Sequence, residues 1–267
     1  CKEHDMPFKE MQRWYDGYYF EKIGHIYSPN SVIEAVDSRE FGNYWSGTET
    51  YESLMTYIAM DFDGLRQLIV DMLGNQRCSI DVESFQNDIT SFKSADDVIT
   101  LLIHMGYLAY DSKTKKVFIP NDEVRSVFLR AIRNDRWEEV IKAVDASEAL
   151  LKATLEMNEK AVAQMIQEVH MQSSSSLIYN NEISLSSVIA LAYYSACGDY
   201  TLVRELPTGN GFADMVFLPK RTSLNPALVV ELKWDKTAEG AISQIKSKGY
   251  VSVLKEYKGN ILLVGIN

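Results

Sequence analysis

Two short apolar runs near the end of the chain carry charged residues where strands are expected. Residues 212–218 read FADMVFL and residues 227–233 read ALVVELK, so the runs hold Asp214 in one case and Glu231 and Lys233 in the other. A charge inside a buried strand costs free energy unless it is paired or coordinates a metal ion. The two runs are therefore predicted to be strands whose charged residues act together.

Side chains alternate along a strand, so Glu231 and Lys233 are predicted to lie on one face. If the strand of Asp214 pairs next to them, the two carboxylates converge, and such oxygen ligands suit Mg²⁺ or Mn²⁺. The ion would polarise a phosphoryl oxygen and lower the pKa of a bound water, while Lys233 oriented that water or stabilised negative charge. The pattern indicates phosphodiester hydrolysis. A cross-strand ion pair at a sheet edge is the alternative interpretation.

The surrounding sequence predicts an alternation of helices and strands. An apolar helix over 183–197 follows Glu182, and residues 198–199 end it. The predicted strands are 200–206, the two runs above and 260–266, with turns at 207–211 and 220–225 and a helix at about 237–250. The predicted order is α-β-β-β-α-β.

This order and three motifs resemble the PD-(D/E)XK nuclease superfamily. The motifs are TGNGFAD at 208–214, VELK at 230–233 and QIKSKGY at 244–250. More narrowly, they look like the nuclease-like domain at the C-terminus of bacterial AAA-ATPase-like proteins. The resemblance implies an α/β (α+β) fold with a restriction-endonuclease-like αβββαβ core and a mixed central sheet.

The resemblance also implies roles for individual residues. Asp214 and Glu231 match the metal ligands, which implies Mg²⁺ or Mn²⁺ as cofactor, and Lys233 matches the catalytic lysine. Glu182 matches the glutamate of the first helix that often completes the site, and Gln244 matches a nearby helix glutamine. A first-turn carboxylate favoured by the helix dipole and an exposed helix residue are the respective alternatives.

The tail of the same helix is expected to contact nucleic acid. Lys246, Lys248 and Tyr250 are the residues concerned, with packing as the other interpretation for the last two. The family often has an arginine where this chain has Phe212. A cation for the substrate backbone is therefore missing there, while the metal ligands are intact.

Upstream motifs resemble the closing part of the AAA-ATPase-like domain of those proteins. They are WYDGY at 14–18, IYSPNSV at 26–32 and YWSGT at 44–48. The sequence contains no G-x-x-x-x-G-K-[ST] motif, so no ATP site is expected in it. We therefore expect a fragment whose missing N-terminal ATPase-like portion is its natural partner.

The middle of the chain predicts a winged-helix-like unit. A helix over 94–105 with Ser94 as N-cap, strands at 107–110 and 116–119, and a helix from Asp122 give the order helix, hairpin, helix. We place the boundary after residue 134, so that 1–134 is the ATPase-like and winged-helix-like part and 135–267 the nuclease-like domain. Amphipathic helices at 137–146 and 147–172 are expected to cover the sheet of the second domain.

Charge favours the C-terminal part as the place for a polyanion. Residues 201–267 hold nine Lys/Arg against six Asp/Glu, a net charge of +3, which leaves −13 for residues 1–200 of a total of −10. The acidic part repels a phosphate backbone. Nucleic acid is therefore an expected partner of the C-terminal domain only. A noncatalytic regulatory or protein-interaction module that keeps the nuclease fold is the alternative function.

Hydropathy and cysteines argue against membrane and disulfide classes. No apolar run approaches the roughly 18 to 20 residues of a membrane helix, and no signal-peptide pattern opens the chain. The three cysteines, Cys1, Cys78 and Cys197, are far apart, which indicates neither a disulfide framework nor a zinc ribbon. A cytoplasmic protein without a membrane partner is expected.

Overall fold

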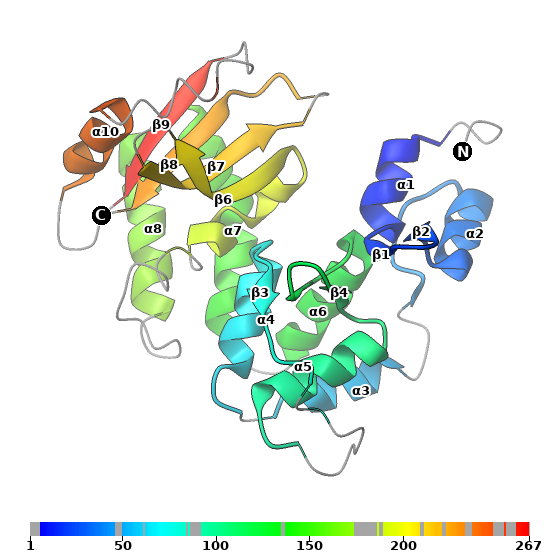
Figure 1. The fold of residues 1–267 in the computed structure, drawn as a ribbon. Coiled ribbons are helices and arrows are strands. Elements are labelled where there is room, and N and C mark those ends of the chain that lie inside the picture. The colour runs from blue at the N-terminus through cyan, green and yellow to red at the C-terminus, as the bar shows by residue number, and fades with distance from the viewer. Residues whose placement is uncertain are drawn as a thin grey trace. The chain divides into compact units, whose positions relative to one another are not determined.

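The chain folds into two compact units, residues 1–138 and 139–267 (Figure 1). The computed structural model describes residues 6–45, 50–60, 62–83, 85, 92–134, 137–173, 186, 189–208, 211–220, 223–232, 237–247, 254 and 260–266. None of the helices in these ranges is long and apolar enough to cross a membrane. Each unit is described by itself.

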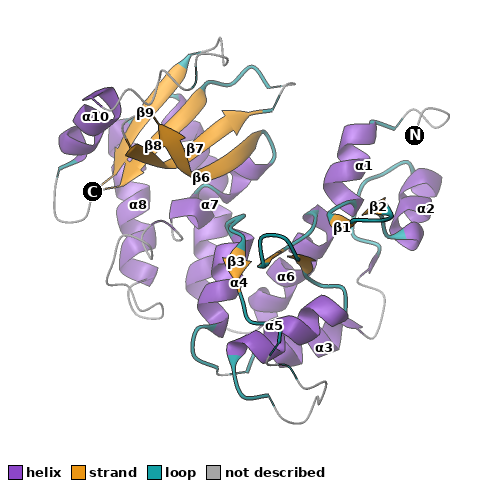
Figure 2. Ribbon diagram, in the orientation of Figure 1, coloured by secondary structure: helices purple, strands orange, loops and turns teal. Residues whose placement is uncertain are grey.

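The first unit is mainly helical, with short strands between the helices (Figure 2). Its helices are α1 (Phe8–Tyr15), α2 (Pro29–Ser38), α3 (Thr50–Ile58), α4 (Leu65–Leu73), α5 (Ala95–His104) and α6 (Asp122–Asn134). Its strands are β1 (Tyr18–Phe20), β2 (Gly24–Ile26), β3 (Cys78–Ser79), β4 (Ala109–Asp111) and β5 (Lys116–Phe118). The strands pair as an antiparallel β1–β2 hairpin and a sheet of order β3-β5-β4.

Helix α5 begins where its sequence predicts. The Ser94 side chain accepts a hydrogen bond from the Asp97 N–H, and the Asp97 side chain accepts one from the Ser94 N–H, so both residues satisfy amide groups of the first turn. The order α5, β4–β5 hairpin, α6 agrees with the predicted helix, hairpin, helix. Strand β3 is an addition that the sequence did not predict, and the winged-helix interpretation stays a prediction.

A buried carboxylate ties the 43–45 segment to α6. Glu123 is fully buried, and its Oε1 accepts hydrogen bonds from the backbone N–H groups of Tyr44 at 2.9 Å and Trp45 at 3.1 Å. Burial raises the pKa of this carboxyl above its ordinary value, against the effect of these hydrogen bonds. The Trp45 ring stacks on Tyr107 with the centroids 5.5 Å apart. Tyr44 and Trp45, the first two residues of the motif at 44–48, thus contact buried residues of this unit, and the rest of the motif lies outside the described residues.

The second unit begins with α7 (Glu138–Leu155) and α8 (Glu159–Ser173). The predicted helix boundary at 146/147 is wrong. Ser147 lies inside α7. Its hydroxyl does not cap a new helix, but donates to the Val144 carbonyl at 2.6 Å and accepts from the Ser195 N–H at 3.2 Å. The chain turns instead at Met157, whose φ is 56°, and Asn158 caps α8 through the Ala161 N–H at 3.2 Å.

A four-stranded mixed sheet is the centre of the second unit. It contains β6 (Tyr200–Thr208), β7 (Gly211–Pro219), β8 (Ala227–Leu232) and β9 (Ile261–Ile266) in the order β6-β7-β8-β9. The first three strands are antiparallel neighbours, whereas β9 runs parallel to β8. This mixed sheet agrees with the predicted central sheet and is consistent with a restriction-endonuclease-like fold.

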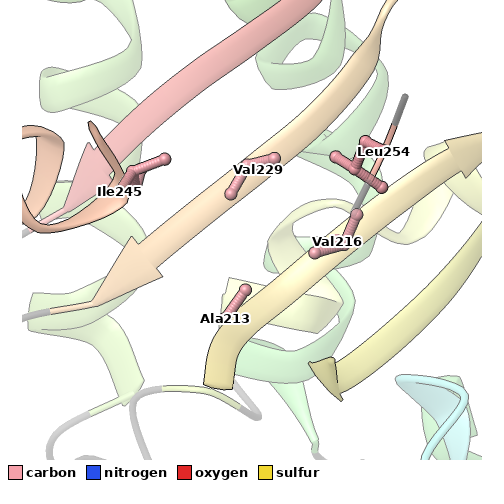
Figure 3. Packing of buried hydrophobic residues seen from close by; sticks show 5 residues of the cluster. All are labelled: Ala213, Val216, Val229, Ile245 and Leu254. Atoms are coloured by element: carbon pink, nitrogen blue, oxygen red, sulfur yellow. The ribbon is translucent and has the colours of Figure 1, made fainter. Parts of the chain in front are cut away.

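Both faces of the sheet are covered. Helix α10 (Ala238–Ser247) packs on one face, where Ile245 joins Ala213, Val216, Val229 and Leu254 in a buried apolar cluster (Figure 3). On the other face Tyr193, which precedes the 3₁₀ segment η3 (Tyr194–Cys197), packs against Phe217 with the ring centroids 5.4 Å apart. Burial of these apolar side chains on both faces fixes the strand ends in place.

The predicted turn at 207–211 is wrong in its extent. Pro207 pairs with Phe212 and Thr208 with Gly211, so three of these five residues belong to the β6–β7 hairpin. Only residues 209 and 210 separate the two strands. A two-residue Gly-Asn connection between strand-like runs is a hairpin signal that would have given the right boundary.

Gly265 sets how closely β9 approaches α10. A Cβ at this position would lie 2.5 Å from the Ala238 carbonyl oxygen and 3.1 Å from the Ala241 Cβ. Gly265→Ala is expected to destabilise the chain by about 1–3 kcal/mol, because backbone rather than a flexible side chain must shift. Thermal unfolding measures the effect. Gly240→Ala, in α10 with only the Thr237 Oγ1 at 3.4 Å, is the control, and an equal loss in both variants would contradict the account.

Candidate metal centre

The candidate site lies where the β7–β8 ladder ends. The observed pairs are Phe217↔Leu228, Val216↔Val229 and Met215↔Val230. Along this register the next opposing residues are Asp214 and Glu231, the two carboxylates that the sequence singles out. The strands therefore bring to one place two acids that are 17 positions apart in the sequence.

Beyond the last regular β7–β8 pair, the side chain of Asp214 accepts the hydrogen bond from the β8 backbone. Asp214 Oδ2 accepts a hydrogen bond from the Leu232 N–H at 2.7 Å. A carboxylate accepting from a backbone N–H makes a charge-assisted bond, which is roughly twice as strong as a neutral one. The bond fixes the Asp214 carboxylate against the end of β8, next to Glu231.

Glu231 is a fully buried carboxylate that faces α10. It has no exposed surface, and the other residues of β8 are buried as well. The Gln244 side-chain amide donates a hydrogen bond to Glu231 Oε1. Gln244 therefore lies at the predicted site and acts through Glu231, whose orientation it fixes. The helix that covers the core also positions one of the two acids.

The donor set fits a hard divalent cation. Asp214 and Glu231 offer carboxylate oxygens from adjacent strands, and a carboxylate as deeply buried as Glu231 is costly without nearby positive charge. Within the described ranges, no group of three or more His, Cys, Asp and Glu residues could hold a metal ion. The described residues thus offer two carboxylates as candidate ligands, and water or substrate oxygens would complete the coordination of a divalent cation.

The backbone of β6 is distorted opposite Asp214. Glu205 has φ of 50°, and it lies between the regular pairs Arg204↔Met215 and Leu206↔Ala213. A non-glycine residue in this left-handed region costs roughly 1–2 kcal/mol.

The side-chain alternation of β7 is broken at the same level. Ala213 and Val216 belong to one cluster on the α10 side, although residues three apart on a regular strand point to opposite faces. Strand β7 bends at Ala213 (Figure 3). The hairpin therefore changes direction next to Asp214, one of the two candidate ligands.

The other predicted site residues divide into two groups. Lys233, Glu182, Lys248 and Tyr250 lie outside the described residues. Lys246 is described and is exposed in the last turn of α10. Because successive helix residues are rotated by about 100°, Lys246 is roughly 200° around α10 from Gln244. It therefore points away from the side of α10 that meets Glu231.

A comparison with protein families found a match to part of the second unit. The model of the PD-(D/E)XK nuclease superfamily matches residues 184–267. Comparisons with curated proteins and with solved structures gave no match. The match covers β6 to β9, α10 and both carboxylates, so the matched region includes the candidate site.

Sequence reasoning missed the Leu232 N–H as the partner of Asp214 and missed the distortion at Glu205. The first had a weak signal, since an acid at the end of an apolar strand can accept from a neighbouring backbone. The second had none, because glutamate is not a residue type that indicates a left-handed conformation.

The distortion makes the residue type at position 205 matter. Glu205→Val is expected to destabilise the chain by about 1–2 kcal/mol, because a β-branched side chain fits the left-handed region poorly, whereas Glu205→Gly should be at least as stable as the parent. Chemical denaturation measures both. Thr201→Val, at an exposed and regularly paired position of β6, is the control. A stable Glu205→Val variant would show that the left-handed conformation is wrong.

Proposed function

We propose that the second unit is a Mg²⁺- or Mn²⁺-dependent phosphodiester hydrolase that acts on DNA. The observation that carries the proposal is the end of the β7–β8 ladder, where Asp214 and Glu231 are the next opposing residues and Gln244 holds the second. The superfamily match over the same strands supports it. PD-(D/E)XK nucleases generally use divalent metal ions, which agrees with this donor set.

Each residue has a role in the proposed reaction. Asp214 and Glu231 would hold the ion, which when bound would polarise a phosphoryl oxygen and lower the pKa of a water. Lys233 follows Glu231 by two residues in the sequence, and the side-chain alternation predicted for this run puts its ammonium on the Glu231 side, where it would orient the attacking water or stabilise the developing negative charge. Gln244 positions Glu231. Glu182 is proposed to approach the site from the helix before β6.

The first unit is proposed to belong to an ATPase-like module that controls the hydrolase. Support comes from the motifs at 14–18, 26–32 and 44–48, which resemble the closing part of an AAA-ATPase-like domain of bacterial proteins. Residues 1–138 hold 15 Lys/Arg against 23 Asp/Glu, and this acidic charge makes the unit an unsuitable surface for DNA. Nucleic acid is therefore proposed to bind the second unit.

Cleavage of supercoiled plasmid by the purified chain tests the proposal. Nicking is expected with Mn²⁺ or Mg²⁺ and not with EDTA. Asp214→Asn, Glu231→Gln and Lys233→Ala should each lose roughly a hundredfold or more in rate, the share that a positioned catalytic group contributes. Glu239→Gln removes an exposed carboxylate of α10 and should retain parental activity. Equal cleavage by all variants would identify a contaminant and overturn the proposal.

A noncatalytic regulatory module with the same fold is the second candidate. The observation that favours it is the small number of ligands, since no three-residue metal group occurs among the described residues. A folded parent chain that neither cleaves plasmid nor binds Mn²⁺ would establish this candidate in place of the first.

A further inference from the structure

Strand β7 changes which of its side chains face α10 at the level of Asp214. Residues two apart in a regular strand share a face, so Asp214 would join Val216 on the α10 face, with Ala213 on the opposite one. Ala213 is instead fully buried with Val216 in the apolar cluster on the α10 side (Figure 3). The backbone of β7 therefore turns between these two residues, and the Asp214 carboxylate meets the Leu232 N–H at the end of β8.

Strand β6 makes the matching change at Glu205, the residue across from Asp214. One residue of each strand lies between the two flanking pairs, which are Arg204↔Met215 and Leu206↔Ala213. Neither strand therefore gains a residue at this level. Leu206 packs against the same apolar cluster as its partner Ala213. The two strands thus turn together within one row, and the left-handed backbone of Glu205, with φ of 50°, is where β6 turns.

Glu205 differs from the other described non-glycine residues that have a positive φ. Those residues follow helices or lie in turns: Arg39, Asn75, Lys115 and Met157. Glu205 instead lies within a strand that is paired on both sides of it. A strained residue persists where the surrounding structure requires its conformation, and such residues concentrate at functional sites. The conformation of Glu205 is therefore tied to the row that contains Asp214.

The backbone of Glu205, and not its carboxylate, accounts for this link. The Glu205 side chain is exposed. Since no group of three or more His, Cys, Asp and Glu residues in the described ranges could hold a metal ion, Glu205 is not a third ligand beside Asp214 and Glu231. The backbone of Glu205, by contrast, sets the direction of the β6–β7 hairpin at the row from which the Asp214 carboxylate reaches β8.

Resting on the proposed function, we propose that Glu205 is a positioning residue that acts through Asp214. Its left-handed conformation lets the β6–β7 pairing continue across the bend, and the bend directs the Asp214 carboxylate to the Leu232 N–H, beside Glu231. A residue type that resists the left-handed region opposes this bend. The Asp214 carboxylate then spends less time in the orientation that holds the ion, although both candidate ligands are still present.

Calorimetric titration of the full chain with Mn²⁺ tests this inference without relying on cleavage. Glu205→Val is expected to weaken Mn²⁺ binding by about 5- to 30-fold, the range that corresponds to the cost of the left-handed region for a residue with a side chain. The apparent affinity falls in proportion to the fraction of molecules in the binding conformation. Glu205→Gly and Glu205→Asn accept the left-handed region, so they should bind Mn²⁺ within about twofold of the parent.

Matched variants separate positioning from loss of charge and from general loss of stability. Glu205→Gln removes the charge but keeps the shape of the side chain, and it should bind Mn²⁺ as the parent does. Met157 has φ of 56° between α7 and α8 of the same unit, and its side chain is 71% exposed. Met157→Val should lower the unfolding temperature as Glu205→Val does, yet it should leave Mn²⁺ affinity unchanged. Circular dichroism checks that each variant is folded at the temperature of the titration.

The outcomes distinguish this inference from the proposed function. If the parent binds Mn²⁺ and cleaves plasmid but Glu205→Val binds Mn²⁺ as tightly, only the positioning role is overturned. Equal losses in Glu205→Val and Glu205→Gln would show that the carboxylate is required, and an equal loss in Met157→Val would show a general loss of stability, so either result overturns the inference. A folded parent that neither binds Mn²⁺ nor cleaves plasmid overturns the proposed function and, with it, this inference.

Discussion

The hydrogen bond from the Leu232 N–H to Asp214 Oδ2 is the contact on which the candidate site depends. At 2.7 Å it anchors the carboxylate of β7 to the backbone of β8 just beyond the last regular pair. Where β7 bends and its regular pairing with β8 ends, a side chain of β7 therefore replaces the backbone as the hydrogen-bond acceptor. The same bond places the Asp214 carboxylate next to Glu231, so the contact at the end of the β7–β8 pairing also brings the two candidate ligands together.

The sheet can hold a buried acid because both of its faces are covered. On one side α10 closes the core through Ile245 and supplies Gln244 to Glu231, and the absence of a side chain at Gly265 lets α10 approach β9. On the other side Tyr193, the residue before η3, packs against Phe217. A fully buried carboxylate at a strand end, fixed by a neutral amide, is a natural place for a hard cation, since the ion offsets a charge that burial makes costly.

Much of this arrangement was predictable because it follows from short-range patterns. The apolar runs around Asp214 and Glu231 predicted β7 and β8, and Ser94 predicted the start of α5. The predicted element boundaries were wrong where tertiary contacts determine the local structure. Ser147 resembles a helix start, yet its hydroxyl forms hydrogen bonds within α7 and with the Ser195 N–H. Residues 207, 208 and 211 were predicted to form a turn, yet they pair as part of the β6–β7 hairpin. The left-handed backbone conformation of Glu205 depends on the distorted hairpin as a whole, and the local sequence does not indicate it.

Calorimetric titration of the full chain with Mn²⁺ tests the central claim that two strands assemble a cation site at their shared end. The account predicts saturable binding by the parent, loss of that binding in Glu231→Gln, and parental binding in Glu239→Gln, whose exposed carboxylate lies in the same unit. Binding that is unchanged in Glu231→Gln, or a folded parent with no binding at millimolar Mn²⁺, would contradict it.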